Sequence, residues 1–295
     1  MSQSNFPVNT ISELAILLGV TEPRLSHLAN NAEKLYSRRQ EPKRSGGFRT
    51  ISSPKPQLKE IQRKLHKRLF LQLDMGPFAH CGIKKKSNIT NACAHAGSAV
   101  IFTFDLKSFF PSVRPERVKT ALIDEFACPP NVASLITRLV TADFELPQGA
   151  PTSTDIANIV TIRLQRRLYP LTKQWGVKKF TMYADDVGFS GNNIPEGFRT
   201  MAEKVVRKEG FKIHPDKGGV FDKSQSQIVT GVNNAHGPTV GKEKKNWRAE
   251  RHQNAVQYQK GEISDKNFEI SEKRYASRVV YANSVKKLSR KVAEL

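Results

Sequence analysis

Residues 179–190 read KFTMYADDVGFS, two apolar arms around a turn formed by Ala184, Asp185 and Asp186. Apolar arms on both sides of a short polar turn predict a β-hairpin. Two adjacent carboxylates at its tip repel one another, so folding them together costs stability. A divalent cation or a hydrogen-bond network has to offset that cost. We therefore expect the chemistry of this chain to be centred on the hairpin.

A third acidic residue, Asp105, ends the stretch 99–104 (AVIFTF), which predicts a strand. No His or Cys is close in sequence to Asp105 or to the Asp185–Asp186 pair, so all ligands of a bound metal would be oxygen atoms. Oxygen ligands favour Mg²⁺ over zinc. Two Mg²⁺ ions about 3.5 to 4 Å apart would activate an attacking hydroxyl and stabilise a leaving pyrophosphate. The alternative is local: an Asp-Asp turn, with Asp105 as a helix cap.

The rest of the chain predicts helices behind a sheet. Helices are expected where apolar residues recur at helical spacing, and strands where β-branched and aromatic residues run together. Residues 40–48 (QEPKRSGGF) are read as a linker-like segment and 214–219 (HPDKGG) as a loop. The resulting order of elements is typical of an α+β fold. The expected helices are 11–18, 22–30, 58–73, 115–127, 153–168, 196–209 and most of the last 50 residues, and 226–233 is expected to be a strand.

The charge of the chain indicates a polyanionic partner. Its 295 residues carry a formal net charge of +21. The excess is concentrated in two flanks: residues 34–86 hold 15 Lys/Arg against 3 Asp/Glu, and residues 236–295 hold 14 against 7. Basic flanks around a nearly balanced centre suit a nucleic acid held by its phosphates. The alternative is that Lys-rich surfaces only keep the protein soluble.

Other features exclude several classes of protein. No apolar run approaches the roughly 18 to 20 residues that span a bilayer, and the polar start MSQSNFPVNT is not a secretory signal. Cys81, Cys93 and Cys128 lie far apart without a CxxC pair, which argues against a disulfide framework and a structural zinc site. We expect no membrane partner and a location in the reducing cytoplasm.

Five motifs occur in the order in which reverse transcriptases have them. Residues 183–186 (YADD) resemble the YxDD signature of that family, and the other four motifs extend the resemblance on both sides. A set of five is far more specific than any one motif. The other four are Arg49-Thr50-Ile51 with Pro54, resembling the start of the fingers; 104–110 (FDLKSFF), resembling the first catalytic motif; 146–153 (LPQGAPTS) with Asn158, resembling LPQGxPxSxxxxN; and 210–213 (GFKI) with Lys217.

The resemblance implies an α+β right-hand polymerase with fingers, a palm made of an antiparallel sheet backed by helices, and a short helical thumb. The enzyme would be an RNA-directed DNA polymerase, a nucleotidyltransferase that uses two metal ions and dNTP substrates. The expected division is an N-terminal helical unit at 1–33, fingers at 34–98, the palm with the catalytic carboxylates at 99–235, and a basic helical thumb at 236–295.

The resemblance also assigns the metal site. Asp105, Asp185 and the main-chain carbonyl of Leu106 would hold two Mg²⁺ ions, for which Mn²⁺ could substitute, with Asp186 close by. Lys217 matches the position that protonates the leaving pyrophosphate. The loop reading of 214–219 leaves the placement of this lysine open.

Four residues are expected at the incoming nucleotide. Phe110 matches the aromatic position that excludes a ribose 2′-hydroxyl; the alternative is core packing beside Phe109. Gln148 and Gly149 would line the pocket, since a glycine lets the backbone approach closely. Arg49 would pair with triphosphate oxygens, or else be one more contact along the groove.

Two shorter motifs narrow the resemblance to retron reverse transcriptases. Residues 91–95 (NACAH) resemble their NAxxH motif, and residues 229–231 (VTG) resemble their VTG motif. Such an enzyme recognises its own structured noncoding RNA, primes from the 2′-hydroxyl of an internal guanosine, and makes branched RNA-linked single-stranded DNA (msDNA). It generally acts in antiphage defence with a separate effector or toxin protein. Asn91 and His95 are either RNA contacts or a structural pair.

Three alternatives remain open at this point. The first is a reverse transcriptase of another bacterial group, either group II intron-like or diversity-generating. The second is a non-catalytic nucleic-acid-binding scaffold that sequesters an effector. The third is a DNA-binding regulator, because residues 12–25 resemble a helix-turn-helix. Residues 1–33 carry one Arg and three acids, and this negative balance argues against the third.

Overall fold

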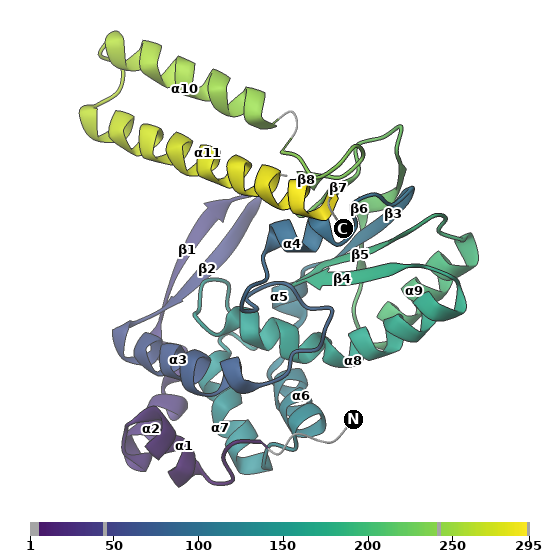
Figure 1. Cartoon of the computed structure of the whole chain (residues 1–295). Coiled ribbons are helices and arrows are strands. Elements are labelled where there is room, and N and C mark those ends of the chain that lie inside the picture. The colour runs from purple at the N-terminus through teal and green to yellow at the C-terminus, as the bar shows by residue number, and fades with distance from the viewer. Residues whose placement is uncertain (1–5, 44–45, 241–242, 294–295) are drawn as a thin grey trace.

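The centre of the molecule is a four-stranded antiparallel sheet (Figure 1). The structure is a computed structural model, and it describes residues 6–43, 46–240 and 243–293. The strand order is β4-β5-β3-β6, so the strand that carries Asp105 lies between the hairpin and a late edge strand. The strands are β3 (Val100–Leu106), β4 (Lys179–Tyr183), β5 (Asp186–Gly191) and β6 (Ile213–Asp222).

One face of this sheet is apolar, because alternate side chains of each strand point to the same side. Phe102 and Phe104 lie on this face with Phe189, which is the partner of Phe102 in the strand register. Phe189 stacks on Phe180 with ring centroids 4.9 Å apart, and Phe198 meets it edge-on at 5.0 Å. The helices that back the sheet or extend its core are α6 (Pro115–Phe126), α7 (Pro130–Val140), α8 (Ser153–Gln174) and α9 (Glu196–Lys208) (Figure 1). The expected α+β architecture is confirmed.

The N-terminal helices share the core of the sheet. Leu14, Leu18 and Leu25 are fully buried, and they belong to the same continuous apolar cluster as Phe102 and Phe104. The expected helices at 11–18 and 22–30 are confirmed as α1 (Ile11–Leu18) and α2 (Glu22–Asn30). Other short elements of the first 112 residues are the 3₁₀ turns η1 (Ala32–Leu35) and η2 (Phe70–Gln72) and the helices α3 (Pro56–Arg68) and α5 (Phe109–Ser112).

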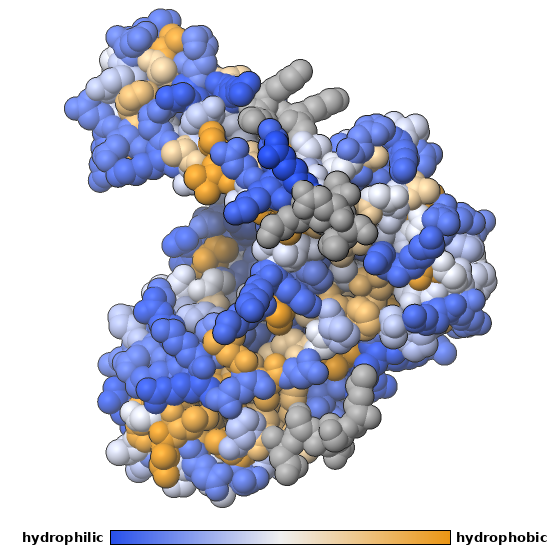
Figure 2. All heavy atoms as spheres, viewed as in Figure 1, coloured by the Kyte–Doolittle hydropathy of each residue, from blue (hydrophilic) through white to orange (hydrophobic). Residues whose placement is uncertain are grey.

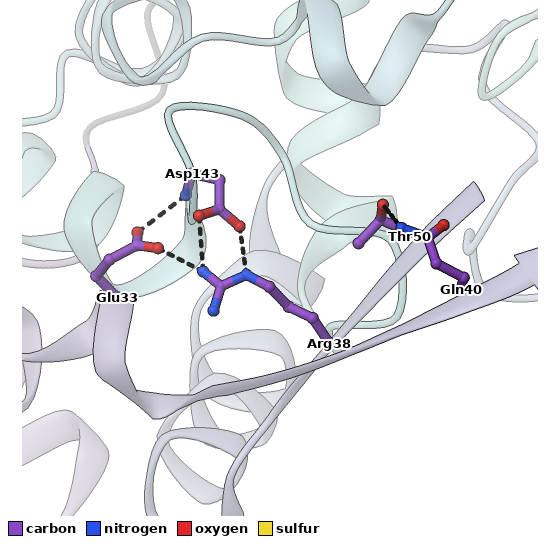
Figure 3. Close-up of polar contacts among 5 residues, drawn as sticks. All are labelled: Glu33, Arg38, Gln40, Thr50 and Asp143. Atoms are coloured by element: carbon purple, nitrogen blue, oxygen red, sulfur yellow. Dashed lines mark hydrogen bonds and ion pairs between the residues drawn. The ribbon is translucent and has the colours of Figure 1, made fainter. Parts of the chain in front are cut away.

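The described residues of the segment 40–48 belong to a β-hairpin and not to a linker, and residues 44–45 lie outside the described part of the chain. They include the ends of two paired strands, β1 (Tyr36–Pro42) and β2 (Phe48–Pro54), with Tyr36 opposite Pro54. The side-chain amide of Gln40 donates to the hydroxyl of Thr50 across the pair, at 3.0 Å (Figure 3). Most side chains of both strands are exposed, so the hydrophobic alternation that normally reveals a strand is absent from the sequence.

An ion-pair cluster anchors this hairpin to the body of the molecule (Figure 3). The guanidinium of Arg38 on β1 donates to both carboxylate oxygens of Asp143, at 2.6 and 2.8 Å, and it also contacts Glu33. The main-chain amide of Asp143 donates to Glu33 at 2.9 Å. A forked guanidinium fixes orientation as well as distance. The base of the hairpin is thereby tied to the loop that precedes residues 146–153.

Residues 226–233 form a tight hairpin and not the single strand expected. The strands β7 (Ile228–Val229) and β8 (Val232–Asn233) pair around Thr230 and Gly231, both of which have positive φ, at 45° and 82°. Two successive residues with positive φ are typical of a two-residue hairpin turn. A local run of strand-forming residues cannot reveal this reversal by itself.

The C-terminal helices pack on the polar side of the sheet through a second, smaller core (Figure 1). They form a helical hairpin, α10 (Glu243–Gln259) and α11 (Asp265–Ala293), and α11 contacts the short helix α4 (Asn88–Cys93). Figure 2 shows a hollow between this hairpin and the rest of the molecule, bordered mainly by hydrophilic residues. The second core consists of Ile89, Ala92, Cys93, Ile101, Val229, Val232, Val240, Ala282 and Val285.

Three other boundaries differ from expectation. The helix expected at 58–73 is α3, which ends at Arg68, and α8 continues past residue 168 to Gln174 with Pro170 inside it. The segment 214–219 is part of β6 and not a loop, because its backbone pairs with β3 across a bulge. No helix within the described ranges has the length and apolar character needed to cross a membrane.

Candidate active site

The strand register brings the three aspartates together. Asp105 near the end of β3 lies opposite Asp186, the first residue of β5. The main-chain amide of Leu106 donates to the main-chain oxygen of Asp185 at 3.0 Å. Only Ala184 and Asp185 therefore form the turn, and Asp186 belongs to the strand. The three carboxylates meet at one end of the two central strands.

The site stabilises an unusual protonation state. The pKa of Asp186 is raised to about 8, mainly by burial and in addition by the neighbouring Asp105 and Asp185. Burial also raises the pKa of Asp185, with a smaller contribution from Asp105. A carboxylate with a raised pKa gains most from a nearby cation. The arrangement therefore favours binding of positive charge.

Lys217 supplies one such charge. Its Nζ lies 2.9 Å from Oδ2 of Asp105, and this hydrogen bond raises the pKa of the lysine. Gly218 makes the approach feasible, because a Cβ at that position would lie 2.2 Å from the main-chain oxygen of Thr103. Its φ of +89° is also one that side chains disfavour. The close passage of β6 over β3 thus carries Lys217 to the aspartates.

The donor chemistry of the site suits a hard divalent cation. The carboxylates of Asp105, Asp185 and Asp186 offer only oxygen atoms, which Mg²⁺ prefers. Within residues 6–43, 46–240 and 243–293, however, no group of three or more His, Cys, Asp or Glu side chains is arranged to hold a metal ion. Metal binding by these aspartates and by the carbonyl of Leu106 stays a prediction.

Three of the four residues expected at the nucleotide meet around one loop. The main-chain oxygen of Gln148 accepts a hydrogen bond from the amide of Ser52 on β2, at 2.8 Å. Gly149 has a φ of +113°, and a Cβ there would lie 3.0 Å from the side chain of Ile51. The main-chain oxygen of Phe110 accepts from Leu146 at 3.3 Å. The loop 146–153 is therefore held between β2 and α5.

The side chains of Phe110 and Arg49 have contacts of their own. Phe110 is half-buried against the core and meets Phe109 edge-on, with centroids 5.6 Å apart. Arg49 lies three residues before Ser52 on β2, and its guanidinium pairs with Glu41 of β1 at 3.1 Å. In this structure Arg49 is an exposed hairpin contact, and its pairing with a triphosphate stays a prediction.

Two other motif residues fix the surroundings of the turn. The hydroxyl of Ser153 donates to the main-chain oxygen of Pro147 at 2.6 Å, which closes the loop at the start of α8. Asn158 donates to the main-chain oxygen of Cys81 at 2.8 Å. Burial and the neighbouring Cys81 thiol raise the pKa of Tyr183 to about 12. The motif asparagine thus holds a chain segment that borders the YADD turn.

His95 contacts both strands of the β4–β5 hairpin, whose turn carries Asp185. Its Nδ1 lies 2.8 Å from the hydroxyl of Ser190 on β5, and its Nε2 lies 2.7 Å from the hydroxyl of Thr181 on β4. Burial lowers the pKa of its imidazole to about 3. The helix α4 ends at Cys93, so His95 lies in the turn that follows. The imidazole joins the two strands whose tip carries Asp185.

The NAxxH and VTG motifs contact each other. The hydroxyl of Thr230 donates to the main-chain oxygen of Asn88 at 2.8 Å, and the Asn88 amide donates to the hydroxyl of Tyr281 on α11, also at 2.8 Å. The amide nitrogen of Asn91 lies 3.4 Å from the Thr230 hydroxyl. Asn88 and Tyr281 are not expected from the sequence. No local signal marks them, because their hydrogen bond joins positions 193 residues apart.

One cavity connects these features. It has a volume of about 840 Å³ and lies on the polar side of the sheet. The catalytic motifs and the two retron-like motifs line it together, although they come from five separate parts of the chain. Its polar lining includes Asn88, Asn91, Asp105, Tyr183, Asp186, Lys217 and Thr230.

The chain is similar in sequence to known reverse transcriptases. The family model described as reverse transcriptase (RNA-dependent DNA polymerase) matches residues 41–234. The retron Mx65 reverse transcriptase of Myxococcus xanthus is 34% identical over 256 residues, which cover 79% of this chain and 60% of that protein. The retron Mx162 reverse transcriptase of the same organism is 38% identical over 221 residues, covering 65% and 45%.

This chain spans about half the length of the curated relatives it matches. Among solved structures, an apo telomerase of Candida tropicalis truncated from its C-terminal domain matches 73% of this chain and 59% of that chain, with 14% identity and a TM-score of 0.48. The family model covers all five motifs and the residues that place Asp105, Asp185, Asp186 and Lys217 together. The chain belongs to the reverse transcriptase family, and the curated relatives it matches are retron reverse transcriptases.

Proposed function

We propose that this chain is the RNA-directed DNA polymerase of a retron. The observation that carries the proposal is that Asp105, Asp186 and Lys217 line one cavity, with Asp185 beside them in the turn, in a member of the reverse transcriptase family. The fingers would be residues 34–98, the palm 99–235 and the thumb 236–295. Residues 1–33 would be a helical unit packed on the fingers and palm.

In the proposed reaction, a primer hydroxyl oxygen attacks the α-phosphorus of a dNTP, and the bond between the α-phosphorus and its bridging oxygen breaks. Asp105, Asp185 and the carbonyl of Leu106, with Asp186 beside them, would hold two Mg²⁺ ions. Bound metal ions would lower the pKa of the attacking hydroxyl and neutralise charge on the phosphates. Lys217 would donate a proton to the leaving pyrophosphate, and its contact with Asp105 keeps the ammonium charged.

The loop 146–153 would form the nucleotide pocket. Gln148 and Gly149 line it, and their attachment to β2 gives the pocket a rigid wall. The ring of Phe110 would exclude a ribose 2′-hydroxyl and so favour dNTPs over rNTPs. Arg49 would exchange Glu41 for triphosphate oxygens, which bind a guanidinium in the same forked geometry.

The proposed template is the protein's own structured noncoding RNA. The first bond would form at the 2′-hydroxyl of an internal guanosine, and the product would be msDNA, branched DNA linked to RNA. The similarity to retron reverse transcriptases and the contact between the two retron-like motifs support this choice. We further propose that the complex acts in the cytoplasm, in antiphage defence, with a separate effector or toxin protein.

The test is to express the chain with its native flanking DNA and to analyse the nucleic acid that copurifies. Samples of wild type, Asp185→Asn and the matched control Asp216→Asn are treated with RNase, DNase or a debranching enzyme. Asp216 is exposed on β6, outside the aspartate cluster. We expect a short DNA that shifts on debranching in wild type and control, and no DNA in Asp185→Asn.

Two results would contradict the proposal. Unbranched DNA in wild type would support the polymerase activity but contradict the assignment to a retron. RNA without DNA in every sample would leave an RNA-binding protein and remove the catalytic assignment.

A further inference from the structure

A second cavity lies on the opposite face of the sheet from the aspartates. It has a volume of about 520 Å³ and is bounded by α9, by the edge strand β6, and by Phe102 and Phe104 of the apolar face. The mechanism proposed above uses none of these residues except Lys217. Its ionisable lining residues are Arg199, Glu203, Arg207, Lys212, His214 and Lys217.

The α9 wall is a stripe of one helix face. Arg199, Glu203 and Arg207 are four residues apart, so they lie above one another on the helix. Glu203 pairs with Arg207 at 3.2 Å and is the only acidic residue of the lining. The Nε of Arg199 is buried and has no hydrogen-bond acceptor among the described residues. A buried guanidinium donor without an acceptor is costly, and a bound anion would satisfy it.

The β6 wall adds two further donors. Lys212 is exposed and forms no ion pair within the described part of the chain. The Nδ1 of His214 accepts a hydrogen bond from the main-chain amide of Asp216 at 3.2 Å. The proton of the neutral imidazole is therefore on Nε2, which can donate to a ligand. Arg199, Lys212 and His214 thus offer hydrogen-bond donors to this cavity. Its one lining carboxylate, that of Glu203, is already paired with Arg207.

We propose that this cavity is an accessory site for linked phosphate groups. Guanidinium, ammonium and imidazole donors are the groups with which proteins bind phosphate oxygens. The volume exceeds that of one phosphate and suits a pyrophosphate or a short stretch of polynucleotide backbone. Lys217 and Gly218 line this cavity and the catalytic one, so the two sites adjoin across β6. The phosphates would come either from pyrophosphate released at the aspartates or from the backbone of bound nucleic acid.

The experiment measures binding without metal or dNTP, so its outcome is independent of polymerase activity. One arm titrates sodium pyrophosphate into the full chain in EDTA by calorimetry. The other measures the salt dependence of binding to a fluorescein-labelled single-stranded RNA. Both compare wild type with Arg199→Gln, Lys212→Gln and the double variant. Arg24→Gln is the matched control, because Arg24 is exposed on α2 in the acidic N-terminal segment.

For a pyrophosphate source, we expect the double variant to weaken pyrophosphate binding by about tenfold or more, since two charge-assisted bonds are removed. For a polynucleotide source, the slope of log K against log salt falls by about 1.4, or roughly 0.7 for each phosphate that the variant no longer neutralises. Either result supports the site. Unchanged pyrophosphate binding together with an unchanged slope, in variants that melt like wild type, overturns it. Lys212→Gln carries the test alone if Arg199 proves necessary for folding, because Lys212 is exposed.

Discussion

Acid should destabilise this protein through His95. The imidazole is fully buried between Thr181 and Ser190, and burial lowers its pKa to about 3, against about 6.5 for an unperturbed histidine. Below pH 6.5 the unfolded chain therefore binds a proton that the folded chain does not. The contribution of neutral His95 to the free energy of unfolding is therefore complete above pH 6.5 and is lost as the pH falls toward 3.

The magnitude follows from the two pKa values. Between pH 7 and pH 5 the unfolded state gains about 2 kcal/mol from protonation of this one residue, and the folded state gains almost nothing. His95→Gln removes this difference. At pH 7 the variant should be about 1 to 3 kcal/mol less stable than wild type, because buried hydrogen bonds are lost. At pH 5 its deficit should be smaller by about 2 kcal/mol.

Urea unfolding of wild type and His95→Gln at pH 7 and pH 5 measures the effect, with tryptophan fluorescence as the signal. Comparing the two proteins at each pH cancels the titration of other groups, including Asp155, whose pKa is raised to about 6, and Asp186. His27→Gln, on the exposed side of α2, is the matched control and should show the same difference at both pH values. An equal deficit of His95→Gln at pH 7 and pH 5 would refute the reasoning.

Three further predictions concern the active site and the β1–β2 hairpin. Gly218→Ala should lower the rate of dNTP incorporation at least about tenfold in single-turnover primer extension, because its Cβ would push β6 and the Lys217 ammonium away from β3. The control Gly97→Ala, which also has positive φ but lies in open space, should leave that rate unchanged. Equal rates for Gly218→Ala and wild type would contradict the proposal. Phe110→Ala should raise the efficiency of rNTP incorporation relative to that of dNTP incorporation. An unchanged ratio of the two efficiencies would indicate that the ring of Phe110 only packs against the core. Arg38→Ala should lower the free energy of unfolding in urea by only about 1 kcal/mol, because the ion pairs are partly exposed. It should nevertheless speed proteolysis within the β1–β2 hairpin. An unchanged rate of proteolysis would show that Asp143 does not anchor this hairpin.

The catalytic hairpin could be predicted from sequence because its information is local. Residues 179–190 contain both strands and the turn, and the run 99–104 ending at Asp105 is equally self-contained. The order of the motifs along the chain then predicted the α+β polymerase fold. Only the position of Asp186 was wrong in detail: it is the first residue of β5 and not part of the turn.

The strand β6 could not be predicted, because its structure depends on a distant partner. The stretch 214–219 (HPDKGG) has almost no intrinsic strand preference. It is extended because β3 provides the pairing, and Gly218 allows the two backbones to approach at the bulge. The same dependence on tertiary contact explains the exposed strands β1 and β2 and the reversal at Thr230.

The helix α4 connects the catalytic hairpin to the C-terminal helices. On one side, His95 just after α4 binds both strands of the hairpin through Thr181 and Ser190. On the other, Asn88 at its start binds the 229–231 turn and Tyr281 of α11. The helix is also packed in the smaller core with Ile101 and Val229, which holds it in place between these two sets of contacts. The two retron-like motifs therefore join α11 to the hairpin that carries Asp185 and Asp186, through hydrogen bonds made at the two ends of α4.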